Sequence, residues 1–374
     1  MFKLLGVFAA ALVLAYFSEK NTEKALARGG RYSVWNDGAY LALVVVLVLF
    51  AGLRTSYNDT VNYIRGFEGM PNVGEWLADP ENFNPFTNPL FYFYESIIKT
   101  VFNNAQMLIF ISVAITQTCF LWFFKRYSQN FLFSVFVYFT LGTFVFTLAA
   151  LKQVMGMAIV TLAFPYLEKK QWGRYFALVF AAMLLHTYAL AFVVLPLFKA
   201  KPWRAFTFVF IAVTAVVMMN FETAITAFME QANDLGKTLA EYEVFDNATI
   251  NVFRLGVYSV PPLISLLFGK WVLKDTTDME NTLIHMSIIS LAFMVMGTQA
   301  GANMFGRMGN YFELGTVCYL PTMLKKTFEP RSYRLISTVA CVCFLGFFVY
   351  ANAFNLTFDT AYSSVNLFDF LFTW

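Results

Sequence analysis

Apolar runs of membrane-spanning length recur along the chain, and short charged or proline-containing segments separate them. A helix needs roughly 20 apolar residues to cross the hydrocarbon core of a bilayer, so each run is a candidate span. We count about eleven hydrophobic passages and expect an all-α, polytopic transmembrane helical bundle. After a first span near the N-terminus, the passages are Val34–Leu53, Ala105–Phe124, Phe131–Leu148, Leu151–Leu167, Tyr175–Phe198, Ala205–Phe221, Val252–Phe268, Leu283–Gln299, Met308–Leu324 and Leu335–Asn352.

The distribution of positive charge orients this bundle. Most of the 26 Lys and Arg residues lie in the short loops on one face, and such residues favour the cytoplasmic side. Two longer polar segments then lie outside: residues 54–89, in which prolines mark turns, and the acidic residues 222–251. The aromatic, amphipathic stretch Pro89–Phe102 is expected at the membrane interface. We expect one integral-membrane domain over residues 1–374.

One passage cannot be a simple span. Basic pairs flank Tyr175–Phe198 on both sides, Lys169 with Lys170 before it and Lys199 with Lys201 after it. Both pairs belong on the cytoplasmic face, and a single span cannot begin and end on the same side. The sequence therefore predicts a broken hairpin of two short helices that turns near His186. Irregular backbone at membrane depth requires protein or a water-filled cavity around it, which places His186 at a cavity.

The composition indicates a membrane protein rather than a soluble one and excludes some partners. Hydrophobic residues make up 59% of the chain, charged residues 13%, and the mean hydropathy is +0.60, whereas a soluble domain carries about 25% charged residues. No Lys/Arg-rich block indicates a nucleic-acid partner. All four cysteines lie within apolar runs, which is typical of packed side chains rather than of metal ligands. Nucleotide-binding glycine motifs are absent, so we expect no cofactor and no metal.

Candidate chemistry gathers at the predicted outer ends of the helices. Arg54 and Asp59 follow the second passage in GLRTSYNDTVNY, a stretch that also contains Tyr63. They are either a pair at the membrane boundary or a site in which the guanidinium binds phosphate oxygens bidentately. Lys152, followed by Gln153, opens an apolar passage. A lysine there either marks the interface or needs an anion to offset the cost of its charge.

Two further candidates lie later in the chain. A lone histidine on an apolar face is more often a packed core residue than a catalyst, but the position of His186 at a hairpin break favours function. Arg307 lies in the short outer turn GANMFGRMGNYFELG. Glu313, about one and a half helical turns further on, is either its charge partner or a substrate contact.

Four motifs of the chain, in order, resemble the EpsG family of Wzy-type polysaccharide polymerases. The first is Gly52, Arg54, Asp59 and Tyr63 at the end of an apolar span, and the second is Lys152–Gln153 at the start of a small-residue helix. The third is His186 at the end of an apolar half-helix, and the fourth is Arg307 with Tyr311. The chain departs from the family pattern at Lys152, where arginine is usual, and at Thr60, where tyrosine is usual.

The resemblance implies a metal-independent membrane glycosyltransferase of the GT-C type on the outer face of the bacterial cytoplasmic membrane. It would join oligosaccharide repeat units carried on undecaprenyl pyrophosphate into O-antigen or exopolysaccharide, with a chain-length regulator as a candidate partner. His186 and Asp59 are the candidate catalytic residues, and we prefer His186 as the base because its ordinary pKa is about 6.5. The candidate substrate-binding residues are Arg54, Lys152, Gln153, Arg307, Tyr63, Tyr311 and Glu313.

Two other functions fit the same pattern of charges. A transporter or flippase for lipid-linked oligosaccharides would also need a cationic outward cavity, although transporters usually contain internal repeats and we find none. An accessory protein of the same pathway is the second alternative. Polymer formation by the purified protein from lipid-linked repeat units separates these functions.

Overall fold

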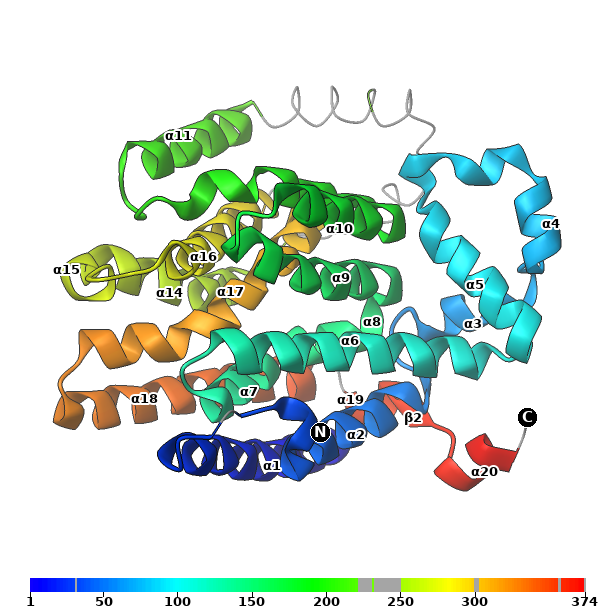
Figure 1. Cartoon of the computed structure of the whole chain (residues 1–374), viewed down its shortest axis with the longest axis horizontal. Coiled ribbons are helices and arrows are strands. Elements are labelled where there is room, and N and C mark those ends of the chain that lie inside the picture. The colour runs from blue at the N-terminus through cyan, green and yellow to red at the C-terminus, as the bar shows by residue number, and fades with distance from the viewer. Residues whose placement is uncertain (31, 221–230, 232–249, 299–302, 356–357, 373–374) are drawn as a thin grey trace. The chain divides into compact units, whose positions relative to one another are not determined.

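Helices make up nearly all of the regular structure in the computed structural model, which describes residues 1–30, 32–220, 231, 250–298, 303–355 and 358–372 (Figure 1). The all-α class predicted from the sequence is confirmed. The chain forms two compact units. Unit 1 comprises Met1–Pro165, Trp172–Ala189 and Val342–Trp374, and unit 2 comprises Tyr166–Gln171 and Leu190–Cys341.

The elements follow the alternation of apolar and polar sequence. The first part of the chain contains α1 (Phe2–Ala27), η1 (Val34–Asn36), α2 (Gly38–Gly52), β1 (Arg54–Ser56), α3 (Thr60–Glu68), α4 (Val73–Ala78), η2 (Pro80–Phe83), η3 (Pro85–Thr87), α5 (Pro89–Phe102), α6 (Ala105–Tyr127), α7 (Phe131–Thr140), α8 (Thr143–Ala149), α9 (Leu151–Glu168) and α10 (Trp172–Leu185). The second part contains η4 (Thr187–Lys199), α11 (Ala205–Met219), α14 (Val252–Leu267), α15 (Gly269–Val272), α16 (Asp278–Met296), α17 (Asn303–Thr327), α18 (Pro330–Val349), η5 (Tyr350–Asn355), α19 (Phe358–Ala361), β2 (Ser363–Ser364) and α20 (Leu367–Phe372).

Fewer helices than predicted are long enough to cross a bilayer alone. Within the described residues, four qualify by length and hydropathy: α1, α6, α16 and the run Pro330–Phe354. The pair α7 and α8, bent by 54°, makes a fifth if it forms one span. Other apolar helices, such as α10 and α14, have 14–16 residues and rise only about 21–24 Å. The estimate of about eleven spans is therefore not confirmed, because apolar composition did not reveal where passages break.

The segment after α2 that was predicted to lie outside is folded, and prolines stand at the starts of some of its helices. Pro80, Pro85 and Pro89 each stand at the start of a helix, where the missing N–H and the fixed φ of proline suit the first turn. The last of these helices is α5, which has the bounds predicted for the aromatic stretch. The second predicted outer segment, residues 222–251, lies outside the described residues apart from 231, 250 and 251.

The predicted break at His186 is confirmed. The helix α10 ends at Leu185, and the 3₁₀ segment η4 begins at Thr187. At the far end of η4, Lys199 Nζ donates a hydrogen bond to the Leu167 carbonyl at 3.0 Å. Leu167 lies five residues before α10, and both partners of this hydrogen bond belong to unit 2. The return of the second segment to the side from which the first started stays a prediction.

In unit 2, α16 and α17 pack closely because small residues lie at their contact. Ser290 Oγ on α16 donates to the Gly309 carbonyl on α17 at 2.9 Å. A Cβ atom on Gly315 would lie only 2.5 Å from Met286 Cβ and 2.6 Å from the Leu283 carbonyl oxygen. Small residues allow helix backbones to approach in this way, and the contact fixes the rotation of α17.

Candidate functional site

Arg54 is the most deeply buried charged residue of the predicted site, with no exposed surface. Its Nε donates to Thr60 Oγ1 at 3.0 Å and its Nη1 to the Ala51 carbonyl at 2.5 Å. Among the described residues, no partner accepts from Nη2. Burial lowers the pKa of Arg54 to about 10, so the guanidinium stays charged at neutral pH. The side chain therefore ties α2 to α3 and keeps one nitrogen available for an acceptor.

Thr60, rather than Asp59, orients this guanidinium. Thr60 opens α3, and its hydroxyl donates to the Tyr57 carbonyl at 2.7 Å while it accepts from Arg54. Asp59 is half-buried and directly precedes α3, but none of the hydrogen bonds from Arg54 goes to it. Arg54 and Asp59 therefore share no direct hydrogen bond, and the roles predicted for Asp59 stay predictions. A carboxylate at the N-terminus of α3 faces the positive end of the helix instead.

The C-terminal segment holds Arg54 in place from the other side. In the two-stranded antiparallel sheet, β1 pairs with β2 and Arg54 lies opposite Ser364. The backbone N–H of Val365 donates to the Leu53 carbonyl at 2.9 Å. Figure 1 shows this C-terminal segment, in red, beside the end of α2 in blue. This pairing could not be predicted from the sequence, because the two strands are about 300 residues apart.

Lys152 lies among tyrosines contributed by α3 and α5. Its backbone N–H donates to Tyr63 Oη at 3.3 Å, and its Nζ donates to Tyr92 Oη at 3.2 Å. The ammonium also lies 5.1 Å from the centroid of the Tyr92 ring and 5.8 Å from that of Phe91. Cation–π contacts of this kind stabilise a charge without neutralising it. Gln153, the next residue, is buried.

Glu95 is a titratable residue of this cluster that the sequence analysis missed. It lies on α5, three residues after Tyr92, and only 5% of its surface is exposed. Burial raises its pKa to about 7, and the nearby charge of Lys152 opposes that rise. One signal in the sequence could have revealed it: Glu95 is the only acidic residue in the aromatic stretch PLFYFYESIIKTVF.

The hairpin break brings His186 to the first residues of α5. Next to it, the backbone N–H of Thr187 donates to Asn88 Oδ1 at 3.1 Å, and its hydroxyl donates to the same atom at 3.2 Å. Asn88 directly precedes α5. The His186 ring packs edge-on against Tyr188, with centroids 4.8 Å apart. The helix α5 is thus the element that links the His186 segment with the cluster around Lys152.

The remaining predicted residues lie in unit 2, on α17. Glu313 is buried and accepts a hydrogen bond from the Tyr258 hydroxyl at 2.7 Å. Arg254 Nη2 donates to Tyr258 Oη at 3.3 Å and to Asn310 Oδ1 at 3.0 Å. Arg254 was not among the predicted site residues, although it stands alone at the start of an apolar passage. Arg307 and Tyr311 lie on the same helix, and the convergence of Arg307 with Arg54 and Lys152 stays a prediction.

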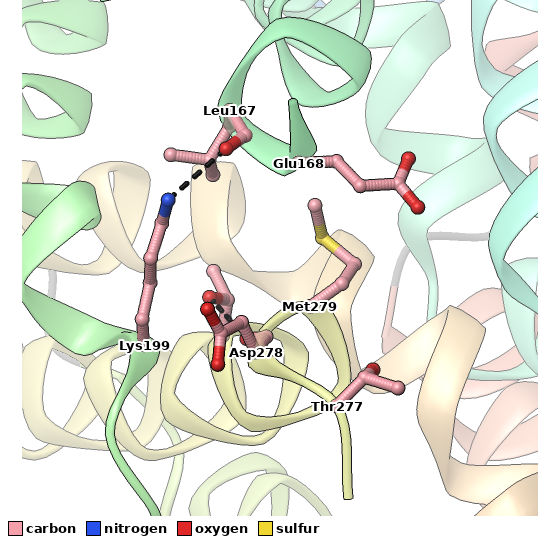
Figure 2. Close-up of a pocket in the computed structure, with 7 residues that line it drawn as sticks. Leu167, Glu168, Lys199, Thr277, Asp278 and Met279 are labelled. Atoms are coloured by element: carbon pink, nitrogen blue, oxygen red, sulfur yellow. Dashed lines mark hydrogen bonds between the residues drawn. The ribbon is translucent and has the colours of Figure 1, made fainter. Parts of the chain in front are cut away.

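Unit 2 also contains a pocket of about 140 Å³ (Figure 2). Lys199 crosses it to reach the Leu167 carbonyl, and Thr277, Asp278 and Met279 line the side formed by the start of α16. None of the predicted site residues lines this pocket.

Comparisons with known proteins place the chain in a family. The EpsG family model matches residues 39–364, which include every predicted site residue. Neither the comparison with curated proteins nor that with solved structures gave a match. Within the described residues, no group of three or more His, Cys, Asp or Glu side chains is arranged to hold a metal ion.

Proposed function

Since the chain belongs to the EpsG family of Wzy-type polysaccharide polymerase-like proteins, we propose that it is a membrane glycosyltransferase that extends a polysaccharide. In this proposal it joins oligosaccharide repeat units carried on undecaprenyl pyrophosphate, on the outer face of a bacterial cytoplasmic membrane. The donor is the growing chain on its lipid pyrophosphate. The acceptor is a sugar hydroxyl of the next lipid-linked unit.

The observation that best supports this proposal is the surrounding of Lys152. The ammonium lies against two aromatic rings, Phe91 and Tyr92, and donates to the hydroxyl of Tyr92. Aromatic rings bind the apolar faces of sugars, and an ammonium binds phosphate oxygens as a point charge. A site that combines them suits a substrate in which a sugar is attached directly to a pyrophosphate.

The reaction needs positive charge at the leaving group. When the acceptor oxygen bonds to the anomeric carbon of the donor, the bond from that carbon to the pyrophosphate oxygen breaks, and the pyrophosphate takes the electron pair. Fixed cations stabilise such developing charge without reorganisation. We assign this role to Lys152, with Arg54 Nη2 as a further donor. Arg307 is expected to contribute from unit 2.

The acceptor hydroxyl must also lose a proton, and the sequence offers His186 and Asp59 for this step. His186 directly precedes Thr187, which binds Asn88 at the start of α5, and we expect it to contact the acceptor sugar. Asp59, at the start of α3, is no longer needed to orient Arg54. Both assignments stay predictions.

Polymer formation by the purified protein tests the proposed function. The protein is reconstituted in lipid nanodiscs and supplied with undecaprenyl-pyrophosphate-linked repeat units as the only substrates. The expected products are ladders of longer glycans on the lipid carrier, together with released undecaprenyl pyrophosphate. Movement of the lipid-linked unit across proteoliposome membranes without elongation would instead identify a transporter. Absence of both activities would leave an accessory role.

A further inference from the structure

Within the part of the chain that the structure describes, the buried carboxylate of Glu95 lacks hydrogen bonds that would offset the cost of burying its charge. Among the described residues, no group donates a hydrogen bond to its carboxylate, and the residue is almost fully buried. Lys99 stands four residues later on α5, the spacing at which Glu and Lys normally pair. Yet Lys99 Nζ donates to the Glu68 carbonyl at 3.2 Å and lies over the Phe67 ring. Lys99 therefore contacts Glu68 and Phe67 instead of pairing with Glu95.

Packing alone does not account for a carboxylate at this position. Removing an ionised group from water without hydrogen bonds costs several kcal/mol, and Phe91 and Ile98 are buried on the same helix. An apolar side chain would fill the site without this cost. Groups held in an unfavourable environment are characteristic of functional sites.

Lys152 is the charge that acts on Glu95. Lys152 Nζ contacts Tyr92 and Phe91, which precede Glu95 by three and four residues. Residues at these spacings lie on one face of a helix. Glu95 and the two aromatic residues that the ammonium contacts therefore lie on the same face of α5, one helical turn apart. A substrate whose phosphates lie at Lys152 would have its anomeric carbon close to Glu95.

We propose that Glu95 takes the proton from the acceptor hydroxyl, an assignment that rests on the proposed polymerase function. The hydroxyl proton passes to the Glu95 carboxylate as the acceptor oxygen bonds to the anomeric carbon. The pyrophosphate leaves with the electron pair, and the proton then passes from Glu95 to water. His186, about 10 Å along α5 from Glu95, binds the acceptor sugar instead.

The titration of Glu95 suits this role. Burial raises its pKa to about 7, so a large fraction is ionised at neutral pH, and a base works best when its pKa lies near the working pH. The titratable groups that interact with it are Lys152 from α9 and Tyr94 from α5 itself, and Tyr92 lies one turn before it on the same face of α5. His186 directly precedes Thr187, which binds Asn88 at the start of α5, and Glu75 of α4 accepts from the Asn72 N–H.

The test compares Glu95→Gln with the wild type in the polymerisation assay. The amide has the size of the carboxylate but cannot accept the proton, so we expect the rate to fall at least ~100-fold. Glu95→Gln also removes a buried charge, so the unfolding temperature should not fall. The control is Glu81→Gln, which changes an exposed carboxylate of the same outer segment and should polymerise normally.

A pH profile separates this assignment from one to His186. The wild-type rate should rise with pH through a midpoint near 7 and then level off, because the ionised carboxylate is the active form. Glu95→Asp should still show a midpoint in its pH profile, with a lower polymerisation rate. His186→Gln should show the same midpoint as the wild type, with a higher KM. Wild-type activity retained by Glu95→Gln, or a midpoint lost only in His186→Gln, would overturn the assignment. If the wild type itself forms no polymer, the proposed function fails first.

Discussion

Among single residues, Arg54 depends on one hydroxyl for its position. Thr60 Oγ1 accepts from Arg54 Nε at 3.0 Å in a fully buried environment. Thr60→Val keeps the shape of the side chain but leaves this donor unsatisfied, so we expect a loss of about 1–3 kcal/mol in the free energy of unfolding. Thermal unfolding in detergent measures it. Thr55→Val removes a more exposed hydroxyl of β1 and should change stability little.

The contribution of the Lys152 charge to the reaction can be measured separately from that of the side-chain shape. Lys152→Met keeps an unbranched chain of similar length without the ammonium, and we expect at least ~100-fold slower polymerisation if the charge stabilises the leaving group. Lys152→Arg keeps the cation and should retain most activity. Arg65→Gln, which removes an exposed charge from α3, is the control. Equal rates for the Met and Arg variants would mean that the charge of Lys152 has no part in the reaction.

At the scale of helices, a substitution at the close contact between α16 and α17 should lower the stability of the protein. Gly315→Ala places a Cβ 2.6 Å from the Leu283 carbonyl oxygen, which the backbone of α16 must move to relieve. We expect destabilisation of about 1–3 kcal/mol, measured as a lower unfolding temperature. The matched control is Gly256→Ala on α14, where no atom lies within 4 Å of the added Cβ. That change should be neutral or slightly stabilising.

The hairpin predicted for α10 and η4 can be tested by the accessibility of its two ends. Arg174 and Lys201 are both exposed and flank the hairpin. Cysteines introduced at these positions should both react with a membrane-impermeant maleimide only after the cytoplasmic face is opened. The exposed Cys343 must first be replaced by Ser. Labelling of the two positions from opposite faces would require a continuous span and would invert the topology that follows.

At the scale of the whole chain, the C-terminal segment is part of the site. Tyr362 stacks on Phe50 with ring centroids 4.8 Å apart, and β2 pairs with β1 beside Arg54. A chain that ends at Asn355 loses these contacts, so we expect it to lose polymerisation and to unfold at a lower temperature. A chain that ends at Val365 keeps β2 and should retain activity. Equal activity of the two chains would contradict a role for this pairing.

Parts of the site could be found in the sequence because their signals are local. Pro80, Pro85 and Pro89 mark helix starts through a fixed φ angle, and these starts determine where α5 begins. The break at His186 followed from the lysines on both sides of its passage. Lys152 was recognisable as a charge that opens an apolar run. Composition was a poor guide to the number of spans, because breaks such as that between α7 and α8 fall within apolar sequence.

The sequence by itself determined the class of protein: the length of its apolar runs requires helices, and its ordered motifs indicate its family. Only the tertiary structure decided which groups meet. Thr60 rather than Asp59 binds Arg54, β2 covers β1 across about 300 residues, and Glu95 shares a helix face with the contacts of Lys152. The physical reason is that apolar length and proline geometry act within a few residues. The partner of a buried charge depends on helices brought together by packing, and residue spacing does not encode it.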